Sequence, residues 1–347
     1  MAVRWYLSGK LLKKTDLADL SKFTTARTNL VMSVFVASKS GTEFSHLACR
    51  PFLQLLDPTE KSTISYLIGC GLAGLSGPAA VKTRVSATPT KIKRLFHASL
   101  FRAHTSLFNT AELDTTDKSQ PDFLGFDELD QVHVFEAKAS FIRTQYSYVV
   151  DGLRQISQIK GIRFPHPLPP VSIPAASRNV CFAFYSSTSV TEWPTAAPPV
   201  TVAAGARCVV VEYYPVVAVI PPPSRTMLSK LVSQLLGIQI IGLWIALLSA
   251  ERVDVEGTWS VHHFNDRDTL VAIGIPTELI EEWNKRMEGL LPAVDGVQRI
   301  QNQYQKRDRL IQLVTELAEV TLEHEANFMD VLPAGVLPME SWRQLVR

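Results

Sequence analysis

Cysteine is scarce in this sequence. Four cysteines lie far apart in the chain, and none belongs to a Cys-x-x-Cys pair: Cys49, Cys70, Cys181 and Cys208. This spacing indicates neither a structural zinc site nor a disulfide framework, so the cysteines are expected to be reduced thiols in a core. With 347 residues, 46% of them hydrophobic, the chain is long enough for two domains and can bury a sizeable core.

Long apolar runs are also few. The amino-terminal segment lacks the uninterrupted apolar run of a signal peptide, so a cytoplasmic chain is expected. One uncharged run, residues 231–250, has about the length that spans a bilayer. Gln234, Gln239 and the lack of a second such run argue against a membrane span, and an apolar helix can equally form the centre of a bundle or a subunit interface. We expect a buried helix, with membrane attachment as the alternative.

Acidic residues are absent from residues 61–111, although the whole chain has a formal net charge of only +2. This stretch carries seven basic residues: Lys61, Lys82, Arg84, Lys91, Lys93, Arg94 and Arg102. A segment of one charge sign suits a phosphate backbone, and it can equally be a solvated basic face. Its position just upstream of the motif described below favours a nucleic-acid cleft. We expect its binding residues to be Lys82, Arg84, Lys91, Lys93, Arg94 and Arg102, extended by Arg154 after the motif.

An acidic residue is also missing where a dinucleotide-binding motif needs one. Gly69, Gly71 and Gly74 satisfy the pattern G-x-G-x-x-G, but no Asp or Glu follows before Glu112. A dinucleotide fold places an acidic side chain about 20 positions after the glycines. The small residues are therefore expected to allow close packing or to form a loop.

The sequence does contain an Asp, a Glu and a Lys within residues 121–138, PDFLGFDELDQVHVFEAK. Residues 122–126 and 132–135 are typical of two short strands, with a polar turn over residues 127–131 between them. A turn centred on Leu129 gives three cross-strand pairs: Phe126 with Val132, Leu124 with Val134, and Asp122 with Glu136. Directly opposed residues project from the same face of a sheet, so the two carboxylates are expected to meet.

Lys138 lies two residues beyond Glu136, so the alternation of a strand places its ammonium group on the same face. Two neighbouring carboxylates repel unless a cation neutralises them, and carboxylate oxygens are ligands that Mg²⁺ prefers. We expect Mg²⁺ here, with Mn²⁺ as a substitute. Such an ion activates water and stabilises charge during phosphodiester cleavage, and Lys138 would orient that water.

Pro121-Asp122, a spacer, and Glu136-Ala137-Lys138 in a hydrophobic strand resemble the motif of the PD-(D/E)XK, or restriction-endonuclease-like, nuclease superfamily. The resemblance covers the motif and the elements around it. It implies an α/β fold with an αβββαβ core and a central mixed sheet. It also implies that the Asp and the Glu bind metal together with the carbonyl of the residue between Glu and Lys, which here is Ala137.

The resemblance implies two supporting residues as well. Many members add an acidic residue from the first core helix, and we match Glu43 to it, at the start of a helix expected over residues 42–56, with Glu60 as the alternative. Several branches carry a Gln on the helix after the lysine strand. The helix expected over residues 148–160 offers Gln155 and Gln158. The expected catalytic residues are Asp122, Glu136, Lys138, Glu43 and Gln155.

Prolines divide the rest of the chain. A loop with five prolines is expected over residues 165–174, and strands are expected over residues 179–186 and 208–220. After Pro223 the pattern turns helical, over residues 224–250, 277–291 and 295–327. We therefore expect a nuclease domain with added strands over residues 1–223 and a mainly helical domain over residues 224–347.

The leading prediction from the sequence is a Mg²⁺-dependent deoxyribonuclease, with a role in restriction, repair or antiviral defence by analogy with the superfamily. DNA is the expected partner and RNA the alternative. The carboxy-terminal helices are expected to form a homo-oligomer or to bind a regulatory protein. A rival reading is a non-catalytic nucleic-acid-binding or assembly protein on the same fold, which the intact Asp, Glu and Lys argue against. A membrane-attached nuclease is the third reading.

Overall fold

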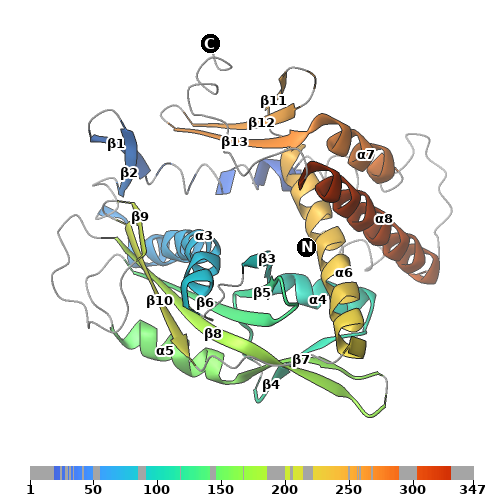
Figure 1. The fold of residues 1–347 in the computed structure, drawn as a ribbon. Helices are drawn as coiled ribbons and strands as arrows, with labels where there is room; N and C mark the ends of the chain where they lie inside the picture. The colour runs from blue at the N-terminus through green and yellow to red at the C-terminus, as the bar shows by residue number, and fades with distance from the viewer. Residues whose placement is uncertain are drawn as a thin grey trace. The chain divides into compact units, whose positions relative to one another are not determined.

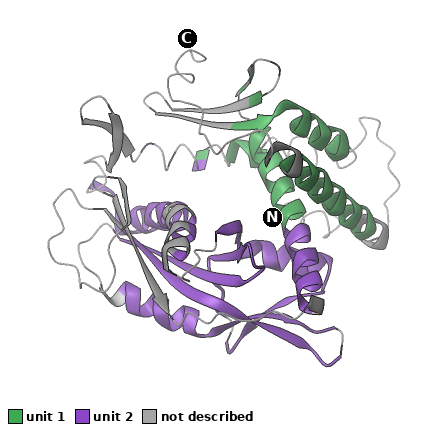
Figure 2. Cartoon of the chain, in the orientation of Figure 1, with its two compact units in different colours: residues 1–26, 236–347 green, residues 27–235 purple. Residues whose placement is uncertain are grey.

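The chain divides into two compact units, residues 27–235 and residues 1–26 with 236–347 (Figure 2). The division falls inside α6 (Pro222–Leu247), not at residue 223 where the sequence pattern changes. The computed structural model describes residues 19–23, 26, 27, 30, 33, 35–40, 43–49, 55–84, 91–117, 119–140, 146–166, 168–185, 200–203, 206–213, 222–248, 251–255, 257, 259–266, 269–288 and 303–329.

The unit of residues 27–235 is built on a mixed sheet of eight strands. Six of them lie in the order β3 (Ile92–His97), β5 (Phe123–Asp127), β6 (Val132–Ser140), β8 (Val171–Tyr185), β10 (Ala206–Tyr213) and β9 (Val200–Ala203). Strands β4 (Glu112–Thr115) and β7 (Ile159–Phe164) join through pairing of β7 with β8. Only the β6–β8 pair is parallel among these described strands. The expected α/β class with a central mixed sheet is confirmed.

Two helices cover opposite faces of this sheet, α3 (Pro58–Arg84) and α5 (Tyr146–Ser157) (Figure 1). Close approach of α3 depends on glycine. A Cβ on Gly69 would lie 2.8 Å from the Cβ of Ala139, and one on Gly77 would lie 2.8 Å from the ring of Phe135. The glycine-rich segment is therefore the interior of a helix packed on β6, as the close-packing interpretation expected.

The β5–β6 hairpin has the register that its sequence predicts. Phe126 pairs with Val132 and Leu124 pairs with Val134. The Asp127 carboxylate holds the turn, because one of its oxygens accepts hydrogen bonds from the backbone N–H groups of Leu129 at 2.9 Å and Gln131 at 2.8 Å. Such an Asx turn fixes where the chain reverses, and therefore which residues of the two strands face each other.

A buried polar network ties this turn to the parallel neighbour β8. Nε2 of His133 donates to the Asp127 carboxylate at 3.1 Å, and Nδ1 lies 2.8 Å from the Ser177 hydroxyl. The Asn179 amide donates to the same hydroxyl at 2.8 Å. Burial raises the pKa of Asp127, but its hydrogen bonds with His133, Gln131 and Leu129 outweigh burial and leave that pKa below its ordinary value. The carboxylate thus stays ionised and holds the hairpin register.

Replacing His133 with alanine is expected to lower the free energy of unfolding by about 3–5 kcal/mol, because it removes the imidazole that bonds Oδ2 of the buried Asp127 carboxylate and the buried Ser177 hydroxyl. Chemical denaturation monitored by circular dichroism measures this loss. His166 is exposed and serves as the matched control. Its replacement with alanine should change stability by less than about 0.5 kcal/mol. Equal effects of the two substitutions would contradict the structural role of His133.

The prediction of a helix over residues 42–56 is wrong. Residues Glu43–Cys49 form β2, which pairs antiparallel with β1 (Phe35–Ser40) in a separate two-stranded sheet. The preceding β-forming residues supply a pairing partner, and Pro51 cannot donate a helical hydrogen bond, so pairing with a neighbouring strand outweighs the helical pattern. The helix that precedes the sheet is α3 instead.

The other unit contains the second part of α6, a three-stranded antiparallel sheet, α7 (Thr277–Met287) and α8 (Gln303–Met329). The sheet consists of β11 (Glu251–Val255), β12 (Trp259–Asp266) and β13 (Thr269–Pro276). The sequence pattern predicted a mainly helical domain here and did not predict this sheet. The Trp283 indole donates to the Thr321 hydroxyl at 3.1 Å and joins α7 to α8.

Helix α6 is long and apolar enough to cross a membrane by length and composition, but 61% of its apolar window is buried inside the protein. Gly237 shows how tightly it packs, because a Cβ there would lie 2.0 Å from the backbone oxygen of Val314 in α8. Burial of this extent is typical of a core helix.

Candidate functional site

The hairpin brings Asp122 beside Glu136. The Asp122 N–H donates to the carbonyl of Phe135 at 3.1 Å, and the Asp122 carboxylate accepts a hydrogen bond from the Ala137 N–H at 2.8 Å. These two bonds tie Asp122 to the residues on either side of Glu136, one position beyond the Phe123–Phe135 pair that ends the β5–β6 ladder. Asp122 therefore lies close enough to Glu136 for its charge to act on that carboxyl group.

The Asp122 charge disfavours the ionised form of Glu136. Burial raises the pKa of Glu136, the nearby Asp122 charge raises it further, and together they bring it to about 7 despite Lys138. Burial likewise raises the pKa of Asp122, although its bond from Ala137 and the charge of Lys138 act in the opposite direction. Within the described part of the chain, Oε2 of Glu136 is buried and accepts no hydrogen bond. The pair therefore offers an unsatisfied oxygen and incompletely neutralised negative charge.

Lys138 contacts one of these carboxylates and a glutamine. Its Nζ donates to Oε1 of Glu136 at 2.7 Å and to Oε1 of Gln155 at 2.5 Å. Gln155 comes from α5, the helix that follows the lysine strand. The alternative, Gln158, lies beyond the end of α5 and binds the Thr116 hydroxyl instead. Of the two glutamines that the sequence offers, Gln155 is the one that lies at this site.

Helix α5 approaches the sheet closely enough to fix this lysine. A Cβ on Gly152 would lie 2.8 Å from Cγ1 of Val180 and 3.4 Å from Cγ of Lys138. Glycine at this position therefore lets the helix backbone rest on the aliphatic part of the Lys138 side chain. The ammonium group is held by this packing as well as by Glu136 and Gln155.

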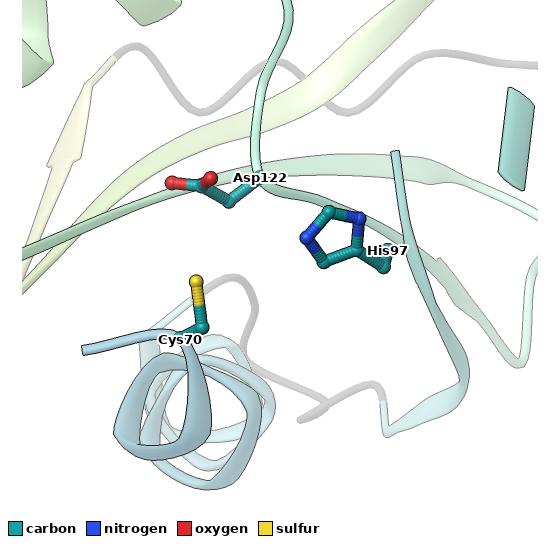
Figure 3. A group of neighbouring side chains, drawn as sticks. All are labelled: Cys70, His97 and Asp122. Atoms are coloured by element: carbon teal, nitrogen blue, oxygen red, sulfur yellow. The ribbon is translucent and has the colours of Figure 1, made fainter. Parts of the chain in front are cut away.

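A second group of side chains shares Asp122. Cys70, His97 and Asp122 each offer one possible ligand atom, and these three atoms lie within 4.8 Å of one another. Figure 3 shows the Cys70 thiol and a ring nitrogen of His97 turned toward the Asp122 carboxylate. The three residues come from α3, from the last residue of β3 and from the start of the β5–β6 hairpin.

Burial governs the electrostatics of this group. Burial raises the pKa of the Cys70 thiol to about 12, and the Asp122 and Glu136 carboxylates add to the effect. Burial lowers the pKa of His97, although the Asp122 charge opposes that shift. Tyr66, one helical turn before Cys70, shares a hydrogen bond with that thiol, and burial raises its pKa to about 12. Without a bound cation, the thiol and the imidazole are therefore neutral near pH 7.

Three residues of the site, Tyr66, Cys70 and His97, were missed by sequence reasoning. No spacing signal links a helical cysteine to a histidine 27 positions later. Their proximity arises because α3 packs on the sheet through Gly69 and Gly77 and because β3 pairs with β5, where His97 faces Phe123. Arg27 also lies close enough for its charge to lower the pKa values of Tyr66, Cys70 and His97.

Neither acidic residue matched to the first core helix has the expected setting. Glu43 lies in β2 and pairs with Ser40, so the helix on which its match depended is missing; its side chain is outside the described residues. Glu60 is exposed and accepts a hydrogen bond from the Asp57 N–H at 3.2 Å, as part of the amino-terminal cap of α3. Glu60 lies ten positions before Cys70 in α3, which corresponds to about 15 Å along the helix axis.

The basic residues that are expected to bind nucleic acid lie on several different elements of the structure. Arg102, on α4 (Ser99–Leu107), donates from Nε to Gln120 at 2.8 Å, two residues before Asp122. Lys91, Lys93 and Arg94 precede His97 by six, four and three residues, which corresponds to about 20, 13 and 10 Å along the strand direction. Arg154 is exposed and forms an ion pair with Asp151 at 3.3 Å. The side chains of Lys82 and Arg84 are outside the described residues.

Asp122, Glu136 and the Ala137 carbonyl are oxygen donors. Hard cations take oxygen ligands. A bound cation would offset the negative charge of these two buried carboxyl groups, whose pKa values are raised. Within the described residues, Oε2 of Glu136 accepts no hydrogen bond, so this oxygen is available as a ligand atom. Comparisons with protein-family models, with curated proteins and with solved structures find no match to this chain.

Proposed function

We propose that this protein is a metal-dependent nuclease that hydrolyses phosphodiester bonds of DNA. The observation that carries the proposal is the pair of buried carboxyl groups, Asp122 and Glu136, with the Lys138 ammonium 2.7 Å from Glu136. Two carboxylates for a cation and one lysine for water and developing charge are the groups that hydrolysis of a phosphodiester requires. The succession α3, β3, β5, β6, α5, β8 supports a restriction-endonuclease-like αβββαβ core, decorated by α4, β4 and β7.

Asp122, Glu136 and the Ala137 carbonyl would hold Mg²⁺, which Mn²⁺ can replace. When bound, the ion supplies Lewis-acid activation of a phosphate oxygen and of water. The Ala137 N–H positions the Asp122 carboxylate through its 2.8 Å hydrogen bond. The hairpin register, fixed by Asp127, keeps Asp122 beside Glu136. The backbone of one hairpin thus sets the geometry of all three ligands.

Lys138 is the catalytic residue for the attacking water in this proposal. Its ammonium group can donate to a water or to a phosphate oxygen in the space next to Glu136, since it carries three N–H groups and two of them are used by Glu136 and Gln155. Charge that develops on the phosphate is then countered by a fixed cation in a partly buried site. Gln155 acts through Lys138 and is a positioning residue.

Cleavage of a mixed panel of nucleic acids tests the proposal. Plasmid, linear duplex, single-stranded DNA and RNA are incubated with the full chain and either Mg²⁺, Mn²⁺ or EDTA. We expect cleavage of DNA with either metal and none with EDTA. Metal-dependent cleavage of RNA alone would replace DNA by RNA as the substrate. Cleavage that persists in EDTA would contradict the metal-dependent mechanism.

The two glutamines provide a matched pair of variants. Gln155→Ala removes the partner of the Lys138 ammonium and should lower kcat by about tenfold while leaving metal affinity unchanged, since the amide does not touch the carboxylates. Gln158→Ala removes a contact with Thr116 and should have little effect on kcat. Steady-state cleavage rates measured at saturating Mg²⁺ compare them. A larger loss for Gln158→Ala would contradict the assignment of Gln155.

Salt dependence locates the nucleic-acid surface. Replacing Lys91, Lys93 and Arg94 together with glutamine should weaken DNA binding and reduce the slope of log Kd against log salt by about 2–3, since each phosphate contact contributes about 0.9. Fluorescence anisotropy at several salt concentrations measures the slope. Lys285→Gln, an exposed position in the other unit, is the control. An unchanged slope in the triple variant would place the surface elsewhere, with Arg102 as the next residue to replace.

A further inference from the structure

A thiol, an imidazole and a carboxylate meet at one end of the sheet, and cleavage by the proposed Mg²⁺ site uses only the last of them. The ligand-type atoms of Cys70, His97 and Asp122 lie within 4.8 Å of one another (Figure 3). Each comes from a different element, so the fold and not a local sequence motif assembles the group. Sulfur, nitrogen and oxygen donors together do not suit Mg²⁺, which prefers oxygen alone.

The donor set fits a borderline transition-metal cation. Zn²⁺ takes Cys sulfur at about 2.3 Å, His nitrogen at about 2.0–2.1 Å and carboxylate oxygen at about 2.0–2.2 Å, in a tetrahedron. Donor atoms around such an ion are roughly 3.3–3.8 Å apart. The three donor atoms lie within 4.8 Å of one another, so their separations exceed this range by at most about 1–1.5 Å, which small side-chain rotations can close. Three protein ligands would leave the fourth position open to water or to another oxygen.

His97 is oriented as a ligand histidine. Its Nδ1 lies 2.8 Å from the Ser99 hydroxyl, and its ring packs edge-on against Phe123 with the ring centroids 5.3 Å apart. The other nitrogen, Nε2, is then the one available to a cation. Histidines that bind metal usually place their second ring nitrogen against an oxygen that fixes the tautomer and the ring orientation. The Ser99 hydroxyl can supply that oxygen here when the ring proton lies on Nδ1, although without a cation Nδ1 also accepts a hydrogen bond from the Ser99 N–H at 3.2 Å.

We propose that Cys70, His97 and Asp122 form a binding site for Zn²⁺ or a cation of the same class, sharing Asp122 with the proposed Mg²⁺ site. As the sulfur–metal bond forms, the thiol proton passes to solvent. Glu136 lies outside this donor set, so the two sites differ in one carboxylate and in their soft donors. The proposal concerns binding and does not depend on cleavage of nucleic acid.

Co²⁺ is the spectroscopic probe for the Zn²⁺ site, because a bond between Co²⁺ and a thiolate gives intense charge-transfer absorption in the near ultraviolet. Titration of the full chain with Co²⁺ should produce this absorption, and one equivalent of Zn²⁺ should abolish it. Cys70→Ser should remove it, and His97→Gln should weaken Zn²⁺ binding about tenfold or more in competition titrations. Circular dichroism establishes that both variants remain folded.

Two control variants separate this site from other thiols and from the proposed Mg²⁺ site. Cys181→Ala removes a buried thiol in the core and should keep the Co²⁺ absorption. Glu136→Gln removes a proposed Mg²⁺ ligand and should also keep it. The proposal is overturned if the unmodified chain gives no sulfur–cobalt absorption, or if the absorption has the same intensity in Cys70→Ser. Neither result depends on nuclease activity, so the two proposals fail separately.

Discussion

Replacing Lys138 with alanine is expected to lower the cleavage rate by about 10²–10³-fold while metal and DNA still bind. The ammonium group lies 2.7 Å from Glu136 and 2.5 Å from Gln155, so it is fixed beside the carboxylates without being one of the cation's ligands. Loss of a fixed group that stabilises developing charge costs a rate factor of this size. Single-turnover cleavage at saturating Mg²⁺ measures the loss, and anisotropy measures DNA binding.

Lys160 provides a matched control for this lysine. It is exposed, lies in β7 and makes no contact with the carboxylate pair in the described residues. Lys160→Ala should change the single-turnover rate by less than about threefold. Loss of one surface charge away from the site affects the binding of substrate more than the rate of the chemical step. Full activity of Lys138→Ala would show that the cleavage site lies elsewhere in the chain.

Replacing Glu136 with glutamine is expected to abolish metal-dependent cleavage and also to stabilise the metal-free protein above pH 7. The pKa of Glu136 is about 7 in the folded protein, against an ordinary value of 4.5. The folded state therefore binds more protons than the unfolded state between these pH values, and stability falls as pH rises through the window. The full penalty, about 3 kcal/mol, is present above pH 7 and absent below pH 4.5.

Denaturant unfolding in EDTA at pH 5 and pH 8 measures this effect. The unmodified protein should lose stability between the two pH values, and Glu136→Gln should lose less. Mg²⁺ should restore stability to the unmodified protein at pH 8, because a ligand that binds only the folded state stabilises it by mass action. Glu136→Gln should gain little from Mg²⁺. Identical pH profiles for the two proteins would contradict a raised pKa at Glu136.

The carboxylate hairpin was predictable from sequence because its determinants are local. Alternation of apolar and polar residues defines the two strands, and Asp127 fixes the turn by bonding to the two backbone N–H groups that follow it. Register then follows from turn length, which brings Asp122, one residue before the Phe123–Phe135 pair, beside Glu136. The choice between Gln155 and Gln158 was open in the sequence because both follow the lysine strand at helical positions. Only the end of α5 at Ser157 separates them.

The remainder of the site depends on tertiary packing. Residues 42–56 carry a helical pattern, yet pairing between β1 and β2 converts Glu43–Cys49 to a strand, so no helical position exists for Glu43. Cys70 and His97 meet Asp122 only because two glycines let α3 approach β6 and because β3 pairs with β5. No residue type or spacing in one sequence encodes such an approach.

The measurement that tests the central claim most directly is calorimetric titration of Mg²⁺ and Mn²⁺ into the unmodified chain, Glu136→Gln and Lys138→Ala. The central claim is that Asp122 and Glu136 hold a divalent cation beside a lysine that is not a ligand. It predicts that the unmodified chain and Lys138→Ala bind either metal, and that Glu136→Gln loses at least about tenfold in affinity. Equal affinity of Glu136→Gln and the unmodified chain, or the lack of binding by both, would contradict it.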